Sequence, residues 1–148
     1  MAYKLDGKDL KIIDILKQHG DYTTREIAKK TLIPTTTVNN RIRKLKSEGI
    51  IKKFTIELDA DRTGKGFTAY VLISANLPFL KQKNKTQYDL VKEIRAFDFV
   101  ESADIVSGGM DIVAVIKVKD VNEFDRALLG RLQNIEGIDK TQSLIVIH

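Results

Sequence analysis

A change in the spacing of apolar residues divides this sequence into two unlike parts. Up to Gly49 the apolar residues recur at the three- and four-residue intervals of amphipathic helices, whereas from Phe67 onward β-branched stretches alternate with helical patterns. The 148 residues suffice for two small hydrophobic cores. We therefore expect a helical domain over residues 1–53, a strand and linker over 54–66, and an α+β domain over 67–148.

Capping residues predict two helices near the N-terminus. Asp6 precedes the first apolar-periodic stretch and fits an N-cap, and Gly20 lies just beyond the end of that stretch. Thr23 and Glu26 have the spacing of a capping box, which predicts a second helix of about two turns.

Pro34 marks a turn before a third helix. Proline cannot continue the second helix, and it biases Ile33 away from the helical region of conformational space. The third helix is predicted over 35–48, where Gly49 ends it. The β-branched and aromatic content of residues 50–59 predicts a strand after it, in the position of a wing.

The third helix has two chemically different faces. At about 100° per residue, Val38, Ile42 and Leu45 form one narrow apolar stripe. The opposite side carries hydroxyl, amide and guanidinium groups, from Thr36, Asn40, Arg43 and Ser47.

The net positive charge of the chain comes entirely from its first part. Residues 1–62 hold 14 Lys and Arg against 9 Asp and Glu, whereas residues 63–148 hold 11 of each. Residues 41–53 alone contain six basic side chains and one acidic one, a local field that attracts a polyanion. A solvated basic surface with no partner is the alternative.

The second part repeats a strand-helix-strand unit, giving the order β-α-β-β-α-β. This order predicts a ferredoxin-like domain, with four antiparallel strands and both helices on one face. The first helix is expected to turn Tyr88, Val91, Ile94 and Phe97 inward. Apolar residues on both sides of the strands predict that a second copy of the chain covers the open face. Strands are expected at 67–77, 100–106, 111–118 and 141–147, and helices at 86–97 and 121–132.

The order of short helix, turn and polar third helix is typical of a helix-turn-helix that inserts its third helix into the major groove of double-stranded DNA. Asn39 and Asn40 have the donors and acceptors to pair with adenine, Arg43 with guanine, and a threonine methyl group packs on thymine. A three-helix packing module that binds nothing is the alternative, and a structural or phosphate-binding role is favoured for Arg41. The expected DNA-contacting residues are Thr24, Arg25, Thr35, Thr36, Thr37, Asn39, Asn40, Arg41, Arg43, Lys44, Lys52 and Lys53.

Three stretches carry a resemblance to a known family over essentially the full length: LDGKDLKIIDILKQHGDYTTREIAKKT, TTTVNNRIRKLKSEGIIKKFTIELD and VSGGMDIVAVIKV. Together they resemble the Lrp/AsnC, or feast/famine, transcription regulators of bacteria and archaea, and an archaeal member is expected. The resemblance implies an N-terminal helix-turn-helix and a C-terminal ferredoxin-like domain that dimerises through its sheets. It also implies tetramers, octamers or larger rings.

The same resemblance implies an amino-acid effector near a loop that reads Gly, two variable residues, Asp. That loop corresponds here to Gly108, Gly109, Met110 and Asp111. Glycines allow backbone amides to approach a carboxylate, and an aspartate can accept an ammonium group. An ordinary hairpin turn capped by Asp111 is the alternative.

The chain departs from the family in two places. Family members have Leu-Ser-Pro before the third helix, whereas this chain has Ile33, Pro34 and Thr35, so Thr35 is expected to take over the N-cap. The connection over 76–87 is longer and more basic than is usual in the family.

Several classes of function lack their signatures. The chain has no cysteine, its longest apolar run is Ile112 to Ile116, and His19 and His148 are isolated, so we expect no metal site, no cofactor, no catalytic residue and no membrane span. The expectation is a cytoplasmic regulator of transcription. A non-specific architectural DNA-binding protein, or a sensor whose assembly depends on a small molecule, is the alternative.

Overall fold

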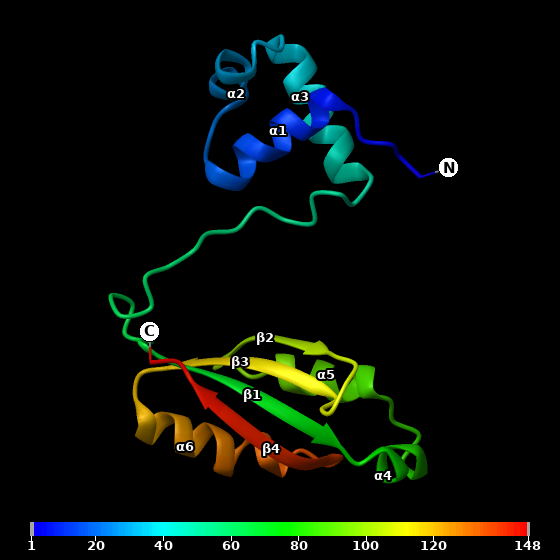
Figure 1. The fold of residues 1–148 in the computed structure, drawn as a ribbon, viewed down its shortest axis with the longest axis vertical. Helices are drawn as coiled ribbons and strands as arrows, with labels where there is room; N and C mark the ends of the chain where they lie inside the picture. The colour runs from blue at the N-terminus through cyan, green and yellow to red at the C-terminus, as the bar shows by residue number, and fades with distance from the viewer. Residues whose placement is uncertain (1, 148) are drawn as a thin grey trace. The chain divides into compact units, whose positions relative to one another are not determined.

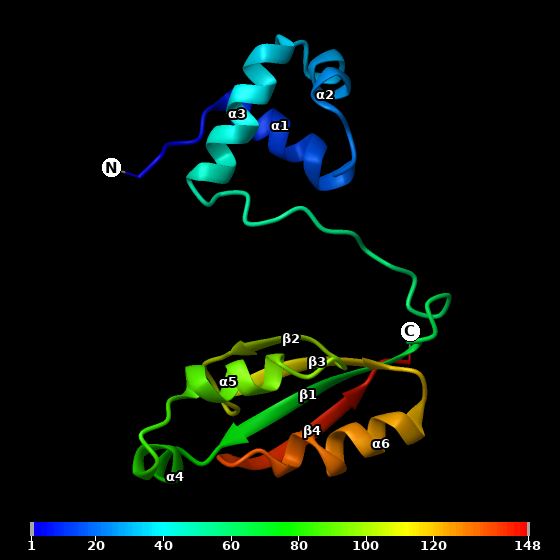
Figure 2. The same cartoon turned by 180° about the vertical axis from the view of Figure 1, so that it is seen from behind.

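The computed structural model describes residues 2–147, and the chain divides into two compact units, Met1–Glu57 and Leu58–His148 (Figures 1 and 2). The first unit is helical and the second combines a sheet with helices, as the change in apolar spacing predicts.

The first unit contains three helices, α1 (Gly7–Gln18), α2 (Thr24–Thr31) and α3 (Thr35–Ser47). Both predicted starts are confirmed. The Asp6 carboxylate accepts from the amides of the first turn of α1, and the capping box at the start of α2 is formed in both directions. The helices meet over a small core of Ile12, Ile27, Ile33 and Val38.

The start of α3 differs from the prediction. Pro34 is the N-cap, no side chain accepts from the first-turn amides, and Thr35 is already the first helical residue. The proline ring holds its own backbone at φ −55° and ψ 139°, outside the helical region, so the helix begins directly after it. The expectation that Thr35 caps the helix is therefore wrong.

Gly49 ends α3 as predicted. It has φ +70°, and the amide of Ile50 donates to the carbonyl of Leu45 at 2.9 Å, which closes the last turn.

The predicted strand over 50–59 is not formed in the structure. A strand needs a neighbouring strand for its hydrogen bonds, and the described part of the first unit is otherwise helical. Phe54, Ile56 and Leu58, at alternate positions of this stretch, are exposed. Strand propensity is present in the sequence, but a partner strand is not.

The second unit has the predicted ferredoxin-like topology. Its strands are β1 (Phe67–Ala75), β2 (Val100–Ile105), β3 (Ile112–Val118) and β4 (Ile138–Ile145), and they form one antiparallel sheet in the order β2-β3-β1-β4.

The helices α5 (Gln87–Arg95) and α6 (Val121–Gly130) cover one face of the sheet (Figures 1 and 2). Alternate strand residues supply the core on that face, among them Val71, Ile73 and Ile116, which are fully buried.

The inward face of α5 differs from the prediction at one residue. Leu90, Val91 and Ile94 are buried, whereas Tyr88 is 79% exposed. At about 100° per residue, Tyr88 lies about 110° around the helix axis from the centre of the stripe formed by these three residues, so it falls outside the face that packs on the core.

A short helix that the sequence did not predict, α4 (Leu77–Gln82), occupies the basic connection after β1. Asn76 caps it by accepting from the amide of Phe79 at 3.0 Å. Leu80 is buried, and its Cδ2 atom lies 2.5 Å from the place where a Cβ atom on Gly137 would stand. Two features therefore favour glycine at 137: an added Cβ would clash with Leu80, and L side chains rarely adopt its φ of +105°.

We predict that Gly137→Ala destabilises the chain by about 1 to 3 kcal/mol, because the new methyl group must displace Leu80 and strain the backbone. Gly109→Ala is the matched control, since an added Cβ there meets nothing within 4 Å. Urea unfolding of the two variants compares them, and equal midpoints would contradict the packing argument.

Candidate nucleic-acid interface and glycine loop

Helix α3 presents a continuous polar face to solvent. Val38 and Leu45 are fully buried beneath it, so the opposite side is accessible along the length of the helix. A shallow hollow of about 450 Å³ on α3 is lined by residues that include Asn39 and Arg43. Of the predicted α3 contacts, the exposed ones are Thr35, Thr36, Asn39, Asn40, Arg43 and Lys44.

Electrostatics distinguish the cations of α3. Within residues 2–147, Arg43 makes no ion pair, so its guanidinium has all its donors available. The Nζ atom of Lys44 lies 2.8 Å from a carboxylate oxygen of Glu48, and this hydrogen bond raises the pKa of Lys44. A surface pair of this kind costs little to open, so Lys44 is still accessible to an anion.

Most of the other predicted contacts lie before or after α3 in the sequence, and Thr37 lies within it. Arg25 is exposed and Thr24 half-buried in the first turn of α2, where unpaired helix amides favour an anion. Lys52 and Lys53 are exposed just after α3 ends. Thr37 is half-buried, at the edge of the polar face.

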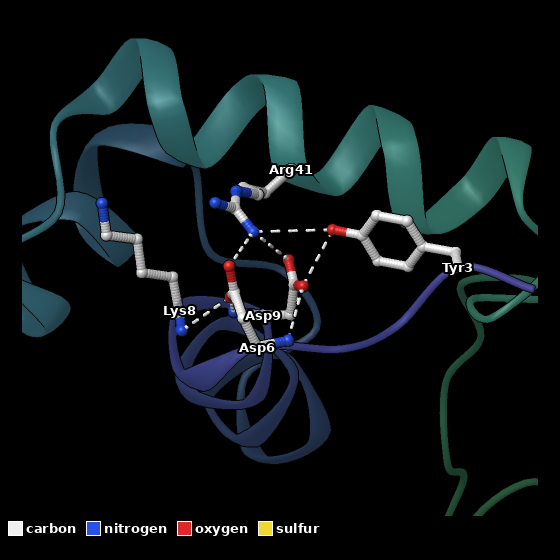
Figure 3. A network of polar contacts seen from close by, with 5 residues as sticks. All are labelled: Tyr3, Asp6, Lys8, Asp9 and Arg41. Carbon is white, nitrogen blue, oxygen red and sulfur yellow. Dashed lines mark hydrogen bonds and ion pairs between the residues drawn. The ribbon is translucent and has the colours of Figure 1, made fainter.

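Arg41 points away from the polar face and holds two helices together (Figure 3). One guanidinium nitrogen, Nη1, donates to the Asp6 carboxylate at 2.5 Å and to the Asp9 carboxylate at 3.2 Å. The other Asp9 oxygen accepts from the Tyr3 hydroxyl at 2.8 Å and from the Asp6 amide at 3.0 Å. Asp9 is completely buried, so these donors replace the water that it loses.

The pKa values in this network shift in the directions that the contacts require. Hydrogen bonds from the Asp9 amide and from Arg41 lower the pKa of Asp6. Hydrogen bonds to Asp6 and Asp9 raise the pKa of Arg41, and the hydrogen bond to Asp9 raises that of Tyr3. These contacts support the structural role for Arg41 over reading of bases.

In the second unit, Asp111 ties the glycine loop to two other elements. One oxygen of its carboxylate accepts from the Ala75 amide at the end of β1 (2.8 Å), and the other accepts from the side-chain amide of Gln87 at the start of α5 (3.2 Å). Its own amide donates to the Ile73 carbonyl at 2.9 Å. Gly108 has φ +147° and is exposed, as is Gly109. Asp111 thus has the turn-stabilising role of the hairpin alternative, and each oxygen keeps one further acceptor position.

The sequence did not predict Tyr3 and Asp9 as partners of Arg41, or Gln87 as a partner of Asp111. The spacing of Asp6 and Asp9 was a usable signal, since an acidic residue three positions after an N-cap can complete a capping box. Gln87 gave no signal, because its partner is 24 residues away in the sequence.

Comparison with known proteins decides the family. A family model described as winged helix-turn-helix DNA-binding matches residues 5–52. A second, the Lrp/AsnC ligand binding domain, matches residues 68–148, more than half of the chain. The chain belongs to the Lrp/AsnC family. It is a transcription regulator with a helix-turn-helix and a ligand-binding domain, and the resemblance seen in the sequence is confirmed.

Relatives of this Lrp/AsnC chain match it along nearly their whole length. HTH-type transcriptional regulator FL11 of Pyrococcus horikoshii is 31% identical over 147 residues, which cover 99% of this chain and 92% of that protein. An uncharacterised HTH-type transcriptional regulator of Pyrococcus furiosus is 31% identical over 145 residues, covering 98% and 94%.

Solved structures share the fold of this Lrp/AsnC chain. A transcriptional regulator of Neisseria meningitidis in complex with L-Met has a TM-score of 0.86 at 22% identity, covering 98% of this chain and 91% of that one. AsnC of E. coli has a TM-score of 0.81 at 21% identity, covering 99% and 94%.

None of the helices within residues 2–147 is long and apolar enough to cross a membrane. In the same range, no group of three or more His, Cys, Asp or Glu side chains is arranged to hold a metal ion.

We predict that Arg41→Met destabilises the first unit strongly, because it leaves the buried Asp9 carboxylate without its cation while keeping most of the side-chain volume. Arg43→Met is the matched control on the same helix and should leave the unfolding midpoint unchanged. Urea unfolding followed by circular dichroism measures both, and equal midpoints would contradict the structural role of Arg41.

Proposed function

We propose that this regulator binds DNA sequence-specifically, with α3 in the major groove. The observation that supports this most directly is the separation of α3 into a fully buried apolar stripe and an accessible face of amide, hydroxyl and guanidinium groups. Asn39 and Asn40 have the bidentate geometry for adenine, and Arg43 the geometry for guanine.

The phosphate contacts are assigned to the cations around α3. Lys44, Lys52, Lys53 and Arg25 are exposed, and Thr24 lies in the first turn of α2. Such contacts fix position on the duplex without reading its sequence. Arg41 belongs to the scaffold beneath this surface rather than to the set of contacts.

A second copy is the partner that fits the uncovered face of the sheet. On that face Tyr70 pairs across the strands with Val115 and Leu144, and Leu72 pairs with Val113. Tyr70 and Leu144 are exposed, so the face carries an open apolar patch, which polar residues of β2 and β4 border. A dimer joined there carries two helix-turn-helix units and binds a palindromic site with half-sites about one helical turn, or a multiple of it, apart. Tetramers and octamers extend the same assembly.

An amino acid is the proposed effector, bound at the loop Gly108–Asp111. Support comes from the match to a ligand binding domain and from the L-Met bound by the Neisseria regulator. In the loop, Gly108 and Gly109 are exposed and the Asp111 carboxylate keeps free acceptor positions.

For DNA binding, we predict that Asn40→Ala or Arg43→Ala costs about 1 to 3 kcal/mol on the preferred site and relaxes one base position. Lys52→Ala should weaken binding to all sequences alike and lower the log-log salt slope by about one. Selection from random duplex DNA, run in parallel on the wild-type chain and the Asn40→Ala, Arg43→Ala double variant, measures the first effect.

A two-fold motif that appears only with the wild-type chain supports reading by α3. The same motif from both proteins would mean that α3 is oriented differently. No motif from either, with binding lost as salt rises, would make this chain a non-specific architectural protein.

For the effector, we predict that calorimetry against the twenty amino acids gives binding heat for at least one, and that Asp111→Asn weakens it about tenfold or more. Asp139→Asn, an exposed aspartate on β4, is the control and should change nothing. DNA binding without the amino acid should be the same in all three proteins. Unaltered affinity in Asp111→Asn would move the site elsewhere.

A further inference from the structure

Leu32, in the turn between α2 and α3, occupies a position that its own side chain disfavours. Its backbone is left-handed, with φ 57° and ψ 26°, and its side chain is 91% exposed. A left-handed conformation brings Cβ too close to the following carbonyl oxygen, so most residues are strained there. Leucine gains no burial within the chain in return for that strain.

The chain itself offers a comparison. Among residues 2–147 the other non-glycine residue with positive φ is Asn84, at 51°. Asparagine tolerates this region because its side chain hydrogen-bonds locally, and glycine has no Cβ to clash. Either residue would satisfy the turn at position 32 better than leucine does. Strain of this kind persists only where the surrounding structure holds it, and such positions cluster at functional sites.

Leu32 lies next to the start of α3, the helix proposed to bind DNA. Two residues, Ile33 and Pro34, separate it from Thr35, the first residue of α3, so the two Cα atoms lie within about 11 Å of each other. That is the span of about three base pairs along a duplex. Lys29 and Lys30, in the last turn of α2, are exposed and make no ion pair within the described residues. The segment just before Leu32 is therefore basic.

We propose that Leu32 is a specificity-determining residue that packs on the C5-methyl group of a thymine in the major groove, beside the bases read by α3. Thymine alone among the four bases presents an apolar group there. The contact buries the leucine side chain, and Lys29 and Lys30 meet the neighbouring phosphates. The inference rests on the proposed insertion of α3, because that insertion brings the duplex to the turn.

Duplex DNA fits this position better than a protein partner does. Leu32 is a single exposed apolar side chain followed by the exposed Pro34, with cations before it and the polar start of α3 after it. A protein interface is built around several apolar anchors, whereas one thymine methyl group needs only one.

The test removes the methyl group from the DNA and the leucine from the protein. Each thymine of the duplex selected with the wild-type chain is replaced in turn by uracil, and affinity is measured for the wild type, Leu32→Gly and Leu32→Asn. For the wild type, uracil at one position should lower the affinity about fourfold, which is the effect of one buried methyl group. Both variants should bind the thymine duplex about fourfold more weakly and show no further loss with uracil there.

Stability separates this role from a structural one. Leu32→Gly and Leu32→Asn relieve the backbone strain, so their urea midpoints should equal or exceed that of the wild type. Leu10→Asn, which removes another exposed leucine on α1, is the control and should keep the wild-type uracil profile.

Two results would overturn the proposal. One is a Leu32→Gly chain that binds the duplex as tightly as the wild type, which would leave a protein partner for Leu32. The other is a loss of affinity that is equal with thymine and uracil at every position, which would assign Leu32 to the sugar-phosphate backbone. Neither result affects the role of α3, which the Asn40 and Arg43 variants test separately.

Discussion

The buried carboxylate of Asp9 is the constraint on which the helical unit depends. A carboxylate fully removed from water is tolerated only when donors surround it, and here they come from Tyr3, the Asp6 amide and Arg41. Arg41 belongs to α3, so satisfying Asp9 fixes where α3 lies against α1. The polar face of α3 is oriented by a contact made on its other side.

Asp111 has a comparable place in the second unit. Its carboxylate joins the end of β1 to the start of α5, and its backbone pairs with Ile73 and with the loop before it. The strands of the sheet therefore hold the loop Gly108–Asp111 through Asp111, while its glycines can adopt a wider range of backbone conformations. A ligand at that loop meets a group that already positions a strand and a helix.

The sequence predicted most of the fold because its signals are local. The Asp6 N-cap, the capping box of α2, the apolar stripe of α3 and the β-α-β-β-α-β order depend on neighbouring residues, and each appears in the structure. The Thr35 cap failed for a local reason, because Pro34 itself occupies the N-cap position. The other failures involve information from outside the segment. The stretch 50–59 has the composition of a strand but no partner strand. Tyr88 fits the helical spacing of apolar residues, but no core residues pack over it. The partners of the Arg41 and Asp111 side chains lie 24 to 38 residues away, beyond what spacing alone reveals.

The uncapped start of α3 has an electrostatic consequence. The peptide dipoles of a helix sum to about half a positive charge at its first turn. An acidic or hydroxyl cap would partly neutralise that charge, but Pro34 offers no acceptor side chain. The end of α3 that begins the polar face thus keeps a positive potential that no titration removes. Its attraction for a polyanion should persist at alkaline pH, where the lysines begin to lose their protons.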